Sequence, residues 1–517
     1  MNLTIGLLQR DAGWELLLKQ IGAAWHVYDA SQTMSPDEFA VIIVNAEPTT
    51  LQRSGLAEYL HAGGSILADD GNVRFFLDCR ITKKHFTSIA PHACGPFSPA
   101  SILDIFAEGH VVTGSRDRTV TDWAAAQIIS NGTGTVVSIP FSVSALLLST
   151  KSHRKNFYSS RERLPSETVS LVSKGAVRRL VTRILEYLHH QRSLPFVHTW
   201  YYPGGHPTVF TFRVDTDKGN KTELQELHDV CVRHHVPGTW FIDVQSHEQW
   251  LDFFSSFTDQ EIGLHCYKHT TGTVRDDVSA NFGTGFRLLR EAGFPVNGAS
   301  APCGTWNPAV DAVYRELGLS YSSEFSLDYD NLPFHPVLGG IESPMLQLPI
   351  HPICVGSMKR SGFTSPQMRE YFRKWTWNRI ASREPVCLYH HPTHHHWEVF
   401  DDIFSFINEM KVPMLSYSAY DFWWRQRIAA TPRFMFDGSI LSIPESAGMN
   451  AELYYRIAFP GNEEIITKIT GSISLTDTPR VRPPESAAIP EDILRARKFD
   501  LRHPLINFLD YWYKTTQ

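Results

Sequence analysis

Short apolar strands alternate with amphipathic helices over residues 207–427, and this alternation limits the possible folds more than any other feature of the sequence. Apolar runs of strand length predict strands buried on both faces, and helices between them favour a parallel sheet. The expected strands are TVFTFRVD, GTWFIDV, VCLYHH and VPMLSY. The expected helices are ELQELHDVCVRHH, FGTGFRLLREAG and AVDAVYRELG. The pattern predicts a distorted (β/α) barrel over 200–428.

The first part of the chain shows a similar alternation. Buried-type strands are expected at 3–8 and 40–46 and in SILAD and GTVVSIPF. Amphipathic helices are expected at about 13–22, 50–62 and 178–192. The second helix should end at Gly63 and Gly64, because glycine commonly stops a helix. We therefore expect residues 1–193 to form an α/β domain with a parallel sheet.

A chain of 517 residues is long enough for two to four domains. The segment SLPFVHTWYYPGGHP is expected to be a linker between the first two domains. Beyond residue 430 the segments ILSIPES, ELYYRIAF and EIITKITGSISL alternate polar and apolar residues between turns. They predict a small β-rich C-terminal unit over 430–517.

Charge and cysteine usage limit the partners and the compartment. The net charge of −6 and the pI near 6.5 offer no cationic field for nucleic acid or anionic lipid. Seven scattered cysteines without a CxxC pair favour reduced thiols. The first residues lack a basic segment followed by an apolar one, and no apolar run approaches eighteen residues. We expect a cytoplasmic protein without a transmembrane segment, whose oligomeric state the sequence leaves open.

Two carboxylates follow the strand TVFTFRVD. Asp215 and Asp217 lie two residues apart at its carboxyl end, where βα barrels assemble their active sites. Two carboxylates that face one cavity repel each other unless a cation lies between them, so a divalent metal is expected there. Taken alone, the pair is more simply explained as caps of the helix that begins near Lys221.

Two histidines follow about fifty residues later. His265 and His269 are four residues apart, a spacing that on one helical turn places both imidazoles on the same face. Two histidines and one carboxylate leave coordination positions open for water and substrate, as a hydrolytic metal requires. Because the chain has 24 histidines, the spacing alone is weak evidence, and its position after the aspartates gives it weight.

Two further segments end near predicted strands. APCGTWNP, at 301–308, is a turn whose backbone amides could face an oxyanion, although a plain βα loop explains it equally well. CLYHHP ends in His390 and His391, of which one can point into a pocket while its neighbour points away.

In this order the four segments resemble the polysaccharide deacetylase family, also called carbohydrate esterase family 4 (CE4) or the NodB homology domain. The resemblance implies that Asp215 is the general base and His391 the general acid. It implies that Asp217, His265 and His269 bind a divalent metal, Zn²⁺ being the expected ion.

The family's RxPxG loop is matched by residues 300–304, so the resemblance assigns Pro302, Cys303 and Gly304 to the oxyanion and substrate loop. Ser300 stands where the family has an arginine that supports the base. Arg213 lies two residues before Asp215 on the same strand face and is either a substitute for that arginine or an ordinary rim residue.

Several other residues have no firm role. The family's fourth motif is not assigned, and the region of Trp375 and Trp377 is its candidate. The three histidines at 394–396 are expected in a solvent-facing loop at the pocket mouth. Sugar stacking and core packing are alternative roles for aromatic residues near the expected site, namely Trp240, Trp306 and Trp397.

The stretch EYLHAGGSILADDG resembles the class I glutamine amidotransferase-like, flavodoxin-like domains. Those enzymes use a cysteine on a sharp turn after a strand, whereas Cys79 and Cys94 lack a GxCxG context. We interpret the first domain as a non-catalytic scaffold or recognition element.

The resulting hypothesis is a metal-dependent deacetylase that releases acetate from an N-acetylated amino sugar of a glycan or glycan precursor. Two alternatives stay open. One is a hydrolase of a non-sugar amide on the same barrel, and the other is a non-catalytic relative that binds a glycan or a partner protein.

Overall fold

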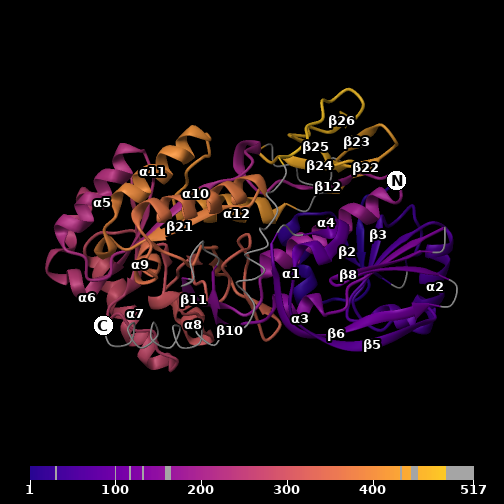
Figure 1. Ribbon diagram of the computed structural model, residues 1–517, viewed down its shortest axis with the longest axis horizontal. Coiled ribbons are helices and arrows are strands. Elements are labelled where there is room, and N and C mark those ends of the chain that lie inside the picture. The colour runs from indigo at the N-terminus through magenta and orange to yellow at the C-terminus, as the bar shows by residue number, and fades with distance from the viewer. Residues whose placement is uncertain are drawn as a thin grey trace. The chain divides into compact units, whose positions relative to one another are not determined.

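The computed structural model describes residues 1–29, 32–98, 101–115, 118–130, 133–157, 165–430, 433–443 and 452–484. The chain forms two compact units, each made of several segments (Figure 1). Unit 1 contains Met1–Ser149, Val172–Gly205 and Trp424–Glu485. The described part of unit 2 lies within Thr150–Leu171 and His206–Trp423. The domain bounds expected from the sequence stay a prediction.

Unit 1 contains a seven-stranded sheet in the order β2-β1-β3-β4-β9-β8-β7. The first five strands are parallel, and β8 and β7 continue the sheet antiparallel. Their bounds are β1 Ile5–Leu7, β2 Trp25–Val27, β3 Val41–Val44, β4 Ser65–Ala68, β7 Thr119–Trp123, β8 Ala126–Ser130 and β9 Thr135–Ser138. Counted along the chain, the parallel strands have the order 2-1-3-4-5, which is that of flavodoxin-like sheets. The predicted α/β class is confirmed.

Two residues connect the ends of β1 and β3. The N–H of Gln9 donates to Oδ1 of Asn45 at 3.1 Å, and Nδ2 of Asn45 donates back to the carbonyl of Gln9 at 2.9 Å. The Gln9 side chain also donates to the carbonyl of Glu47 at 3.2 Å. These hydrogen bonds hold the two strand ends together.

The helices of unit 1 begin and end where their capping residues predict. Asp11 accepts from the N–H of Trp14 at the start of α1, and Gly22, at φ 81°, ends that helix. Thr49 and Gln52 form a capping box on α2. The helices are α1 Ala12–Ile21, α2 Thr50–His61, α3 Val143–Leu147 and α4 Lys174–His190. The sequence-based positions of α1, α2 and α4 agree to within about four residues.

A long antiparallel hairpin between β4 and β7 was not expected from the sequence. It consists of β5 Cys79–Ile89 and β6 Leu103–Ser115, which lie side by side in Figure 1. Most side chains of β5 are exposed, and Lys83 and Lys84 lie at its centre. Because most of β5 faces solvent, it also lacks the apolar pattern that reveals a strand in a sequence.

The predicted linker is partly wrong, because it contains a buried strand. β12 Phe196–Thr199 pairs antiparallel with β24 Tyr455–Phe459, which pairs with β25 Glu463–Thr467. A second small sheet has the order β22-β23-β26, with bounds Met435–Phe436, Ile440–Ser442 and Ser472–Ser474. The expected C-terminal β-rich region is therefore confirmed, and part of it pairs with the segment before residue 200.

Asp69, at the end of β4, is a buried carboxyl in unit 1. It accepts from Nε1 of Trp14 and from the N–H of Val143, each at 3.1 Å. Burial nevertheless raises the pKa of Asp69 to about 7. The folded protein therefore retains a proton on Asp69 between about pH 4 and 7 that the unfolded chain has released.

Replacing Asp69 by Asn should remove a pH dependence of stability. Because the folded-state pKa is raised, the Asp69 contribution is most favourable below pH 4 and is lost as the pH rises through 7. Across that window, the free energy of unfolding of the variant should rise relative to that of the wild type by at most about 1.4 kcal/mol per pH unit. Denaturant unfolding at several pH values measures the difference. The exposed Asp37, changed to Asn, is the control, and an equal trend there would contradict the assignment.

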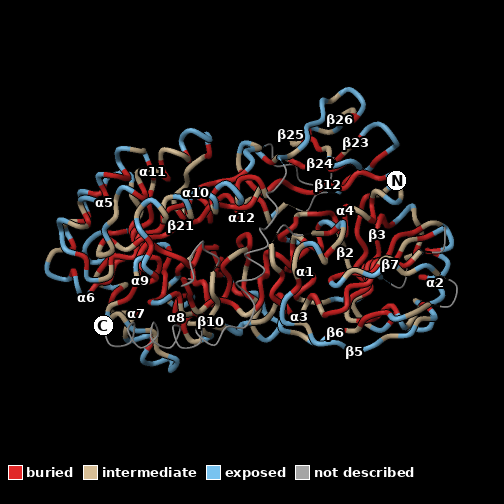
Figure 2. Tube along the Cα trace, viewed as in Figure 1, coloured by how far each residue is buried: buried red, intermediate tan, exposed pale blue. Residues whose placement is uncertain are grey.

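Unit 2 contains a second seven-stranded sheet, in the order β20-β17-β16-β15-β14-β13-β21, in which every pair is parallel. Its bounds are β13 Phe210–Asp215, β14 Thr239–Asp243, β15 Glu261–Cys266, β16 Gly298–Ala299, β17 Tyr321–Ser322, β20 Leu346–Gln347 and β21 Val386–His390. Figure 2 shows the central strands of this sheet as buried. The parallel (β/α) architecture is confirmed.

The strand expected in VPMLSY is wrong, because there only Met414 forms an isolated bridge, with Phe210. Two strand pairs lie outside the large sheet of unit 2, β10 with β11 and β18 with β19. Their bounds are Ser152–Asn156, Ser166–Ser170, Val337–Leu338 and Ile341–Glu342.

Helices connect the parallel strands of unit 2. They are α5 Lys221–Arg233, α6 Val244–His247, α7 Arg275–Glu291, α8 Pro308–Glu316, α9 Val355–Arg360, α10 Ser365–Ala381, α11 Trp397–Glu409 and α12 Tyr417–Ala429, the last of which crosses the boundary into unit 1. Asn220 and Glu223 form a capping box on α5, so Asp217 does not cap that helix. Within the described residues, no helix has the length and apolar character needed to cross a membrane.

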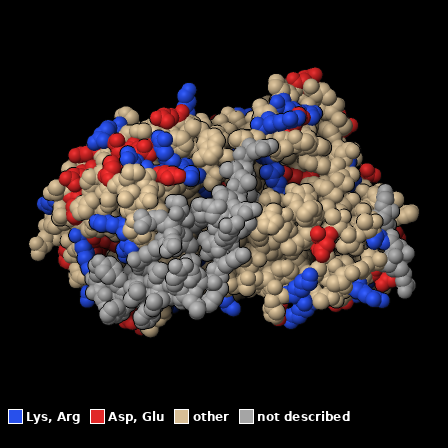
Figure 3. Space-filling model, in the orientation of Figure 1, with Lys and Arg blue, Asp and Glu red and all other residues tan. Residues whose placement is uncertain are grey.

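Opposite charges are mixed on the surface drawn in Figure 3, where basic and acidic side chains lie together over α5, α10 and α11. Arg233 pairs with Asp401, and Arg373 pairs with Asp402 at 2.8 Å. These helices therefore present no field of a single sign on that face.

Candidate active site

The carboxyl ends of neighbouring parallel strands bring the predicted site residues together. Asp215 is the last residue of β13, and Asp217 lies in the turn that follows. His265 is in β15, and His269 lies three residues beyond the end of that strand. The expected helical turn is therefore wrong. The loop after β15 turns back, and in this way the two imidazoles reach one place, with ring centroids 5.2 Å apart.

Asp217, His265 and His269 form a cluster with the geometry of metal ligands. One ligand atom from each lies within 4.8 Å of the others. Nε2 of His265 is 3.1 Å from Oδ1 of Asp217, and Nε2 of His269 is 3.2 Å from Oδ2. Oδ1 and both Nε2 atoms are buried without a hydrogen-bond partner. Buried polar atoms that face one another unpaired are costly, and a divalent cation between them removes that cost, so the donor set fits such an ion.

The charges around Asp217 favour its anionic form. Burial by itself raises the pKa of this carboxyl, but His391 and His265 outweigh burial and hold the pKa well below its ordinary value. Burial likewise lowers the pKa of His269, and the neighbouring Asp217 carboxylate reverses this, so that the net shift is upward.

The main chain of Ser300 orients His265. Nδ1 of His265 lies 2.6 Å from the Ser300 carbonyl oxygen. A carbonyl only accepts, so Nδ1 must carry the proton and Nε2 keeps its lone pair for a metal. Ser300 thus serves this site through its backbone.

Arg213 binds Asp215 with both arms of its guanidinium group. Nε donates to Oδ1 and Nη2 to Oδ2, each at 2.6 Å, and Nη1 donates to the carbonyl of Ser323. The side chains are 1% and 4% exposed, so the ion pair is almost fully desolvated. Burial lowers the pKa of Arg213, but Asp215 outweighs this and raises it. Arg213 therefore fixes the position of Asp215 and neutralises its charge.

His391 faces both aspartates. Its Nε2 is 3.4 Å from Oδ2 of Asp217 and 3.9 Å from Oδ2 of Asp215. Burial lowers its pKa, but Asp217, Cys354 and Asp215 together raise the pKa to about 9. The ring is therefore protonated at neutral pH and able to donate a proton. His390 points away and packs against Phe400, with ring centroids 4.5 Å apart.

The loop at 302–304 follows the residue that anchors His265. Pro302 has no N–H, and the N–H of Gly304 donates to the carbonyl of Ala301 at 3.0 Å. Cys303 has a φ of 57° and is exposed. The role of this loop toward an oxyanion stays a prediction.

Aromatic residues considered for sugar stacking lie in different environments. Trp240 is fully buried in the apolar core of unit 2, so it has a packing role. Trp397 donates from Nε1 to Glu226 at 2.9 Å, and Trp306 is 7% exposed. In the region of the unassigned fourth motif, Trp375 packs against His351 with ring centroids 4.2 Å apart, while Trp377 is 41% exposed.

No motif in the sequence indicated Cys354, which lies beside the candidate site. Cys354, His391 and His394 form a second group with metal-ligand geometry. Burial raises the pKa of the Cys354 thiol, but the two imidazoles outweigh burial and hold it well below its ordinary value. The expected solvent-facing role is wrong for His394, which packs against His391, while the side chain of His395 is 52% exposed.

No family model matches the sequence, and no curated protein matches it. Among solved structures, a Mycobacterium smegmatis protein assigned to the polysaccharide deacetylases aligns at 18% identity, with 44% of this chain and 94% of its own covered and a TM-score of 0.37. An allantoinase aligns at 15% identity, with 44% and 93% covered and a TM-score of 0.37. A CE4 family pseudoenzyme from Bacillus anthracis aligns at 15% identity, with 42% and 66% covered and a TM-score of 0.32. The assignment of the site therefore depends on its own residues.

Proposed function

We propose that this chain is a metal-dependent N-deacetylase that hydrolyses the acetamido group of an amino sugar in a glycan or glycan precursor. The observation that carries the proposal is the convergence of three unpaired ligand atoms, from Asp217, His265 and His269, beside a carboxylate and an imidazolium. The motif resemblance of residues 207–425 to the CE4 deacetylases supports the choice of substrate class. We place the reaction in the cytoplasm.

Asp217, His265 and His269 would hold the metal, most suitably Zn²⁺, which accepts imidazole and carboxylate ligands. When bound, such an ion polarises the amide carbonyl and increases the acidity of water. The chain's own groups move the protons. Asp215, held by Arg213, accepts a proton from the attacking water, and Nε2 of His391 donates a proton to the departing amine nitrogen.

The two aspartates have different roles because they have different neighbours. Asp217 faces three imidazoles and suits a metal ligand. Asp215 has its charge balanced by a guanidinium group that cannot give up its proton, so it stays available as a base. Two similar carboxylates thus divide the work of binding and proton transfer.

The proposal predicts a loss of metal and activity on replacing His265 by Ala. Purified wild-type protein should contain about one equivalent of zinc and release acetate from N-acetylated sugars, whereas the variant should lose both, because one of three protein ligands is gone. Elemental analysis and an acetate assay measure the two quantities. The exposed His61, changed to Ala, is the matched control and should keep metal and activity.

The other results of this experiment separate the remaining candidates. Bound zinc without acetate release from any sugar would overturn the substrate class and favour a non-sugar amide. Absence of metal from the wild type would overturn the hydrolase and favour a non-catalytic binding protein.

We infer further that unit 1 is a non-catalytic scaffold or recognition element. Burial raises the pKa of Cys94 to about 12 and also raises that of Cys79. Neither thiol is therefore activated as a nucleophile, and among the described residues unit 1 contains no other cysteine.

A further inference from the structure

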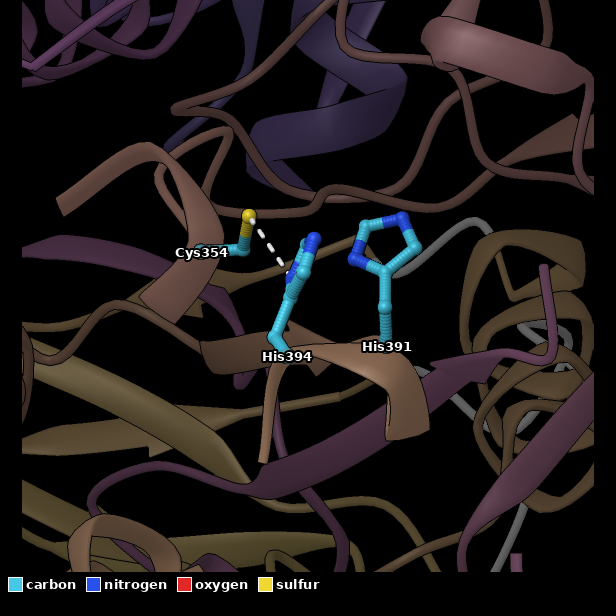
Figure 4. Close-up of side chains that lie close together, drawn as sticks. All are labelled: Cys354, His391 and His394. Carbon is cyan, nitrogen blue, oxygen red and sulfur yellow. Dashed lines mark hydrogen bonds between the residues drawn. The ribbon is translucent and has the colours of Figure 1, made fainter. Parts of the chain in front are cut away.

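Cys354, His391 and His394, which we call the thiolate cluster, lie beside the candidate active site. One ligand atom from each residue lies within 4.8 Å of the others, and Sγ of Cys354 is 4.0 Å from Nδ1 of His394. Figure 4 shows the sulfur pointing toward the imidazole of His394, with the ring of His391 beside it. A sulfur and two imidazole nitrogens are a donor set that Zn²⁺ and related thiophilic ions prefer.

The local backbone builds this cluster. Cys354 directly precedes α9, while His391 and His394 flank the short turn after β21. A Cβ on Gly356 would lie 2.2 Å from Cε1 of His394, so only glycine at this position lets the imidazole lie against α9. The ring centroids of His391 and His394 are 4.5 Å apart.

The two nitrogens of His391 face different groups. Nε2 lies 3.4 Å from Asp217, within the candidate active site. Nδ1 is buried without a hydrogen-bond partner, and Figure 4 shows it on the side of His394. An unpaired buried nitrogen on that side provides the third ligand atom of the cluster.

We propose that the thiolate cluster is a second metal site, which binds a thiophilic divalent cation through Sγ of Cys354, Nδ1 of His394 and Nδ1 of His391. Binding requires Sγ of Cys354 and Nδ1 of His391 without their protons, so any proton that either atom carries is released to solvent, and no oxidation state changes. An ion on Nδ1 excludes the imidazolium form of His391. Occupancy therefore suppresses proton donation from Nε2, and this consequence for activity rests on the proposed deacetylase function.

Cobalt titration of the full chain tests the site itself. Co²⁺ bound by a thiolate produces a charge-transfer absorption band that imidazole and carboxylate ligands do not produce. The wild type should bind two equivalents and show this band, while Cys354→Ser should bind one equivalent and lack the band. Cys79→Ser, which removes a half-buried thiol outside the cluster, should behave as the wild type. A wild type without the band, or an undiminished band in Cys354→Ser, would overturn the proposal.

Two further variants test the site independently, in case Cys354→Ser does not fold. His394→Ala and Gly356→Ala each leave the thiol in place but remove or displace one imidazole, so both should weaken binding of the second cobalt. Asp217→Ala should lose the first ion and keep the charge-transfer band. Two equivalents bound with unchanged affinity in His394→Ala would contradict the ligand set.

An assay of acetate release in excess zinc tests the second site and the proposed function separately. Excess zinc should inhibit acetate release by the wild type and should inhibit Cys354→Ser at least about tenfold less effectively. Equal inhibition of both proteins would overturn the link between the cluster and His391. A protein that shows the cobalt band but never releases acetate would refute the deacetylase assignment and leave the metal site standing.

Discussion

Replacing Asp215 by Asn is expected to lower kcat for acetate release by about 10²- to 10⁴-fold, the usual contribution of a general base. The amide cannot accept a proton at neutral pH, whereas the shape of the side chain is kept. Because Asp215 is not one of the three metal ligands, the variant should still hold about one equivalent of zinc. Steady-state kinetics and elemental analysis on the same preparation measure both effects.

The control for this variant is Asp229→Asn, which changes an exposed carboxylate on α5. It should leave kcat and metal content unchanged. Since Asp215 also pairs with Arg213, the Asn variant must be assayed at a temperature where its circular dichroism shows a folded protein. A folded, metal-containing Asp215→Asn protein with wild-type kcat would show that another group is the base.

Replacing Arg213 by Met should lower the free energy of unfolding by about 3–5 kcal/mol, because it leaves the buried carboxylate of Asp215 without a partner. The methionine preserves most of the volume, so the loss reflects the uncompensated charge more than a cavity. Arg213→Lys should lower the free energy of unfolding by less, since lysine keeps the charge although it cannot make the two parallel hydrogen bonds. Urea unfolding of the three proteins measures the differences.

The matched control removes an exposed arginine from a similar ion pair. Arg287 pairs with Glu291 on α7 at 2.9 Å, with side chains 59% and 58% exposed, so Arg287→Met should cost at most about 1 kcal/mol. The double variant Arg213→Met/Asp215→Asn should recover part of the loss, because no buried charge remains. Equal losses for Arg213→Met and Arg287→Met would refute the buried pair as a source of stability.

The sequence was most informative where burial and secondary structure agree. The strands at the centre of both sheets are apolar and buried, so their pattern alone locates them, as for Val41–Val44 and Val386–His390. β5 was missed because most of its side chains face solvent, and β12 was missed because its partner lies about 260 residues further along the chain. Pairing at such separation leaves no local signal.

Much of the site could be predicted because the carboxyl ends of parallel strands lie at the same edge of a sheet. Asp215, Asp217, His265 and His391 each lie within two residues of the carboxyl end of a strand, so a topological rule brings them together. The helical geometry assumed for His265 and His269 was wrong because β15 continues through His265. Cys354 could not be found in this way, since it belongs to no motif and meets His391 only through the packing of α9.

The hydrogen bonds between the ends of β1 and β3 bear on what unit 1 can bind. Sheets with this strand order accept ligands in the crevice between these two strand ends, where the chain changes direction across the sheet. Here Gln9, Asn45 and Glu47 make three hydrogen bonds to one another beyond these strand ends, each worth about 0.5–1.5 kcal/mol net. A nucleotide-like ligand must displace all three to enter. Binding at these strand ends therefore has to outweigh hydrogen bonds that unit 1 already makes within itself.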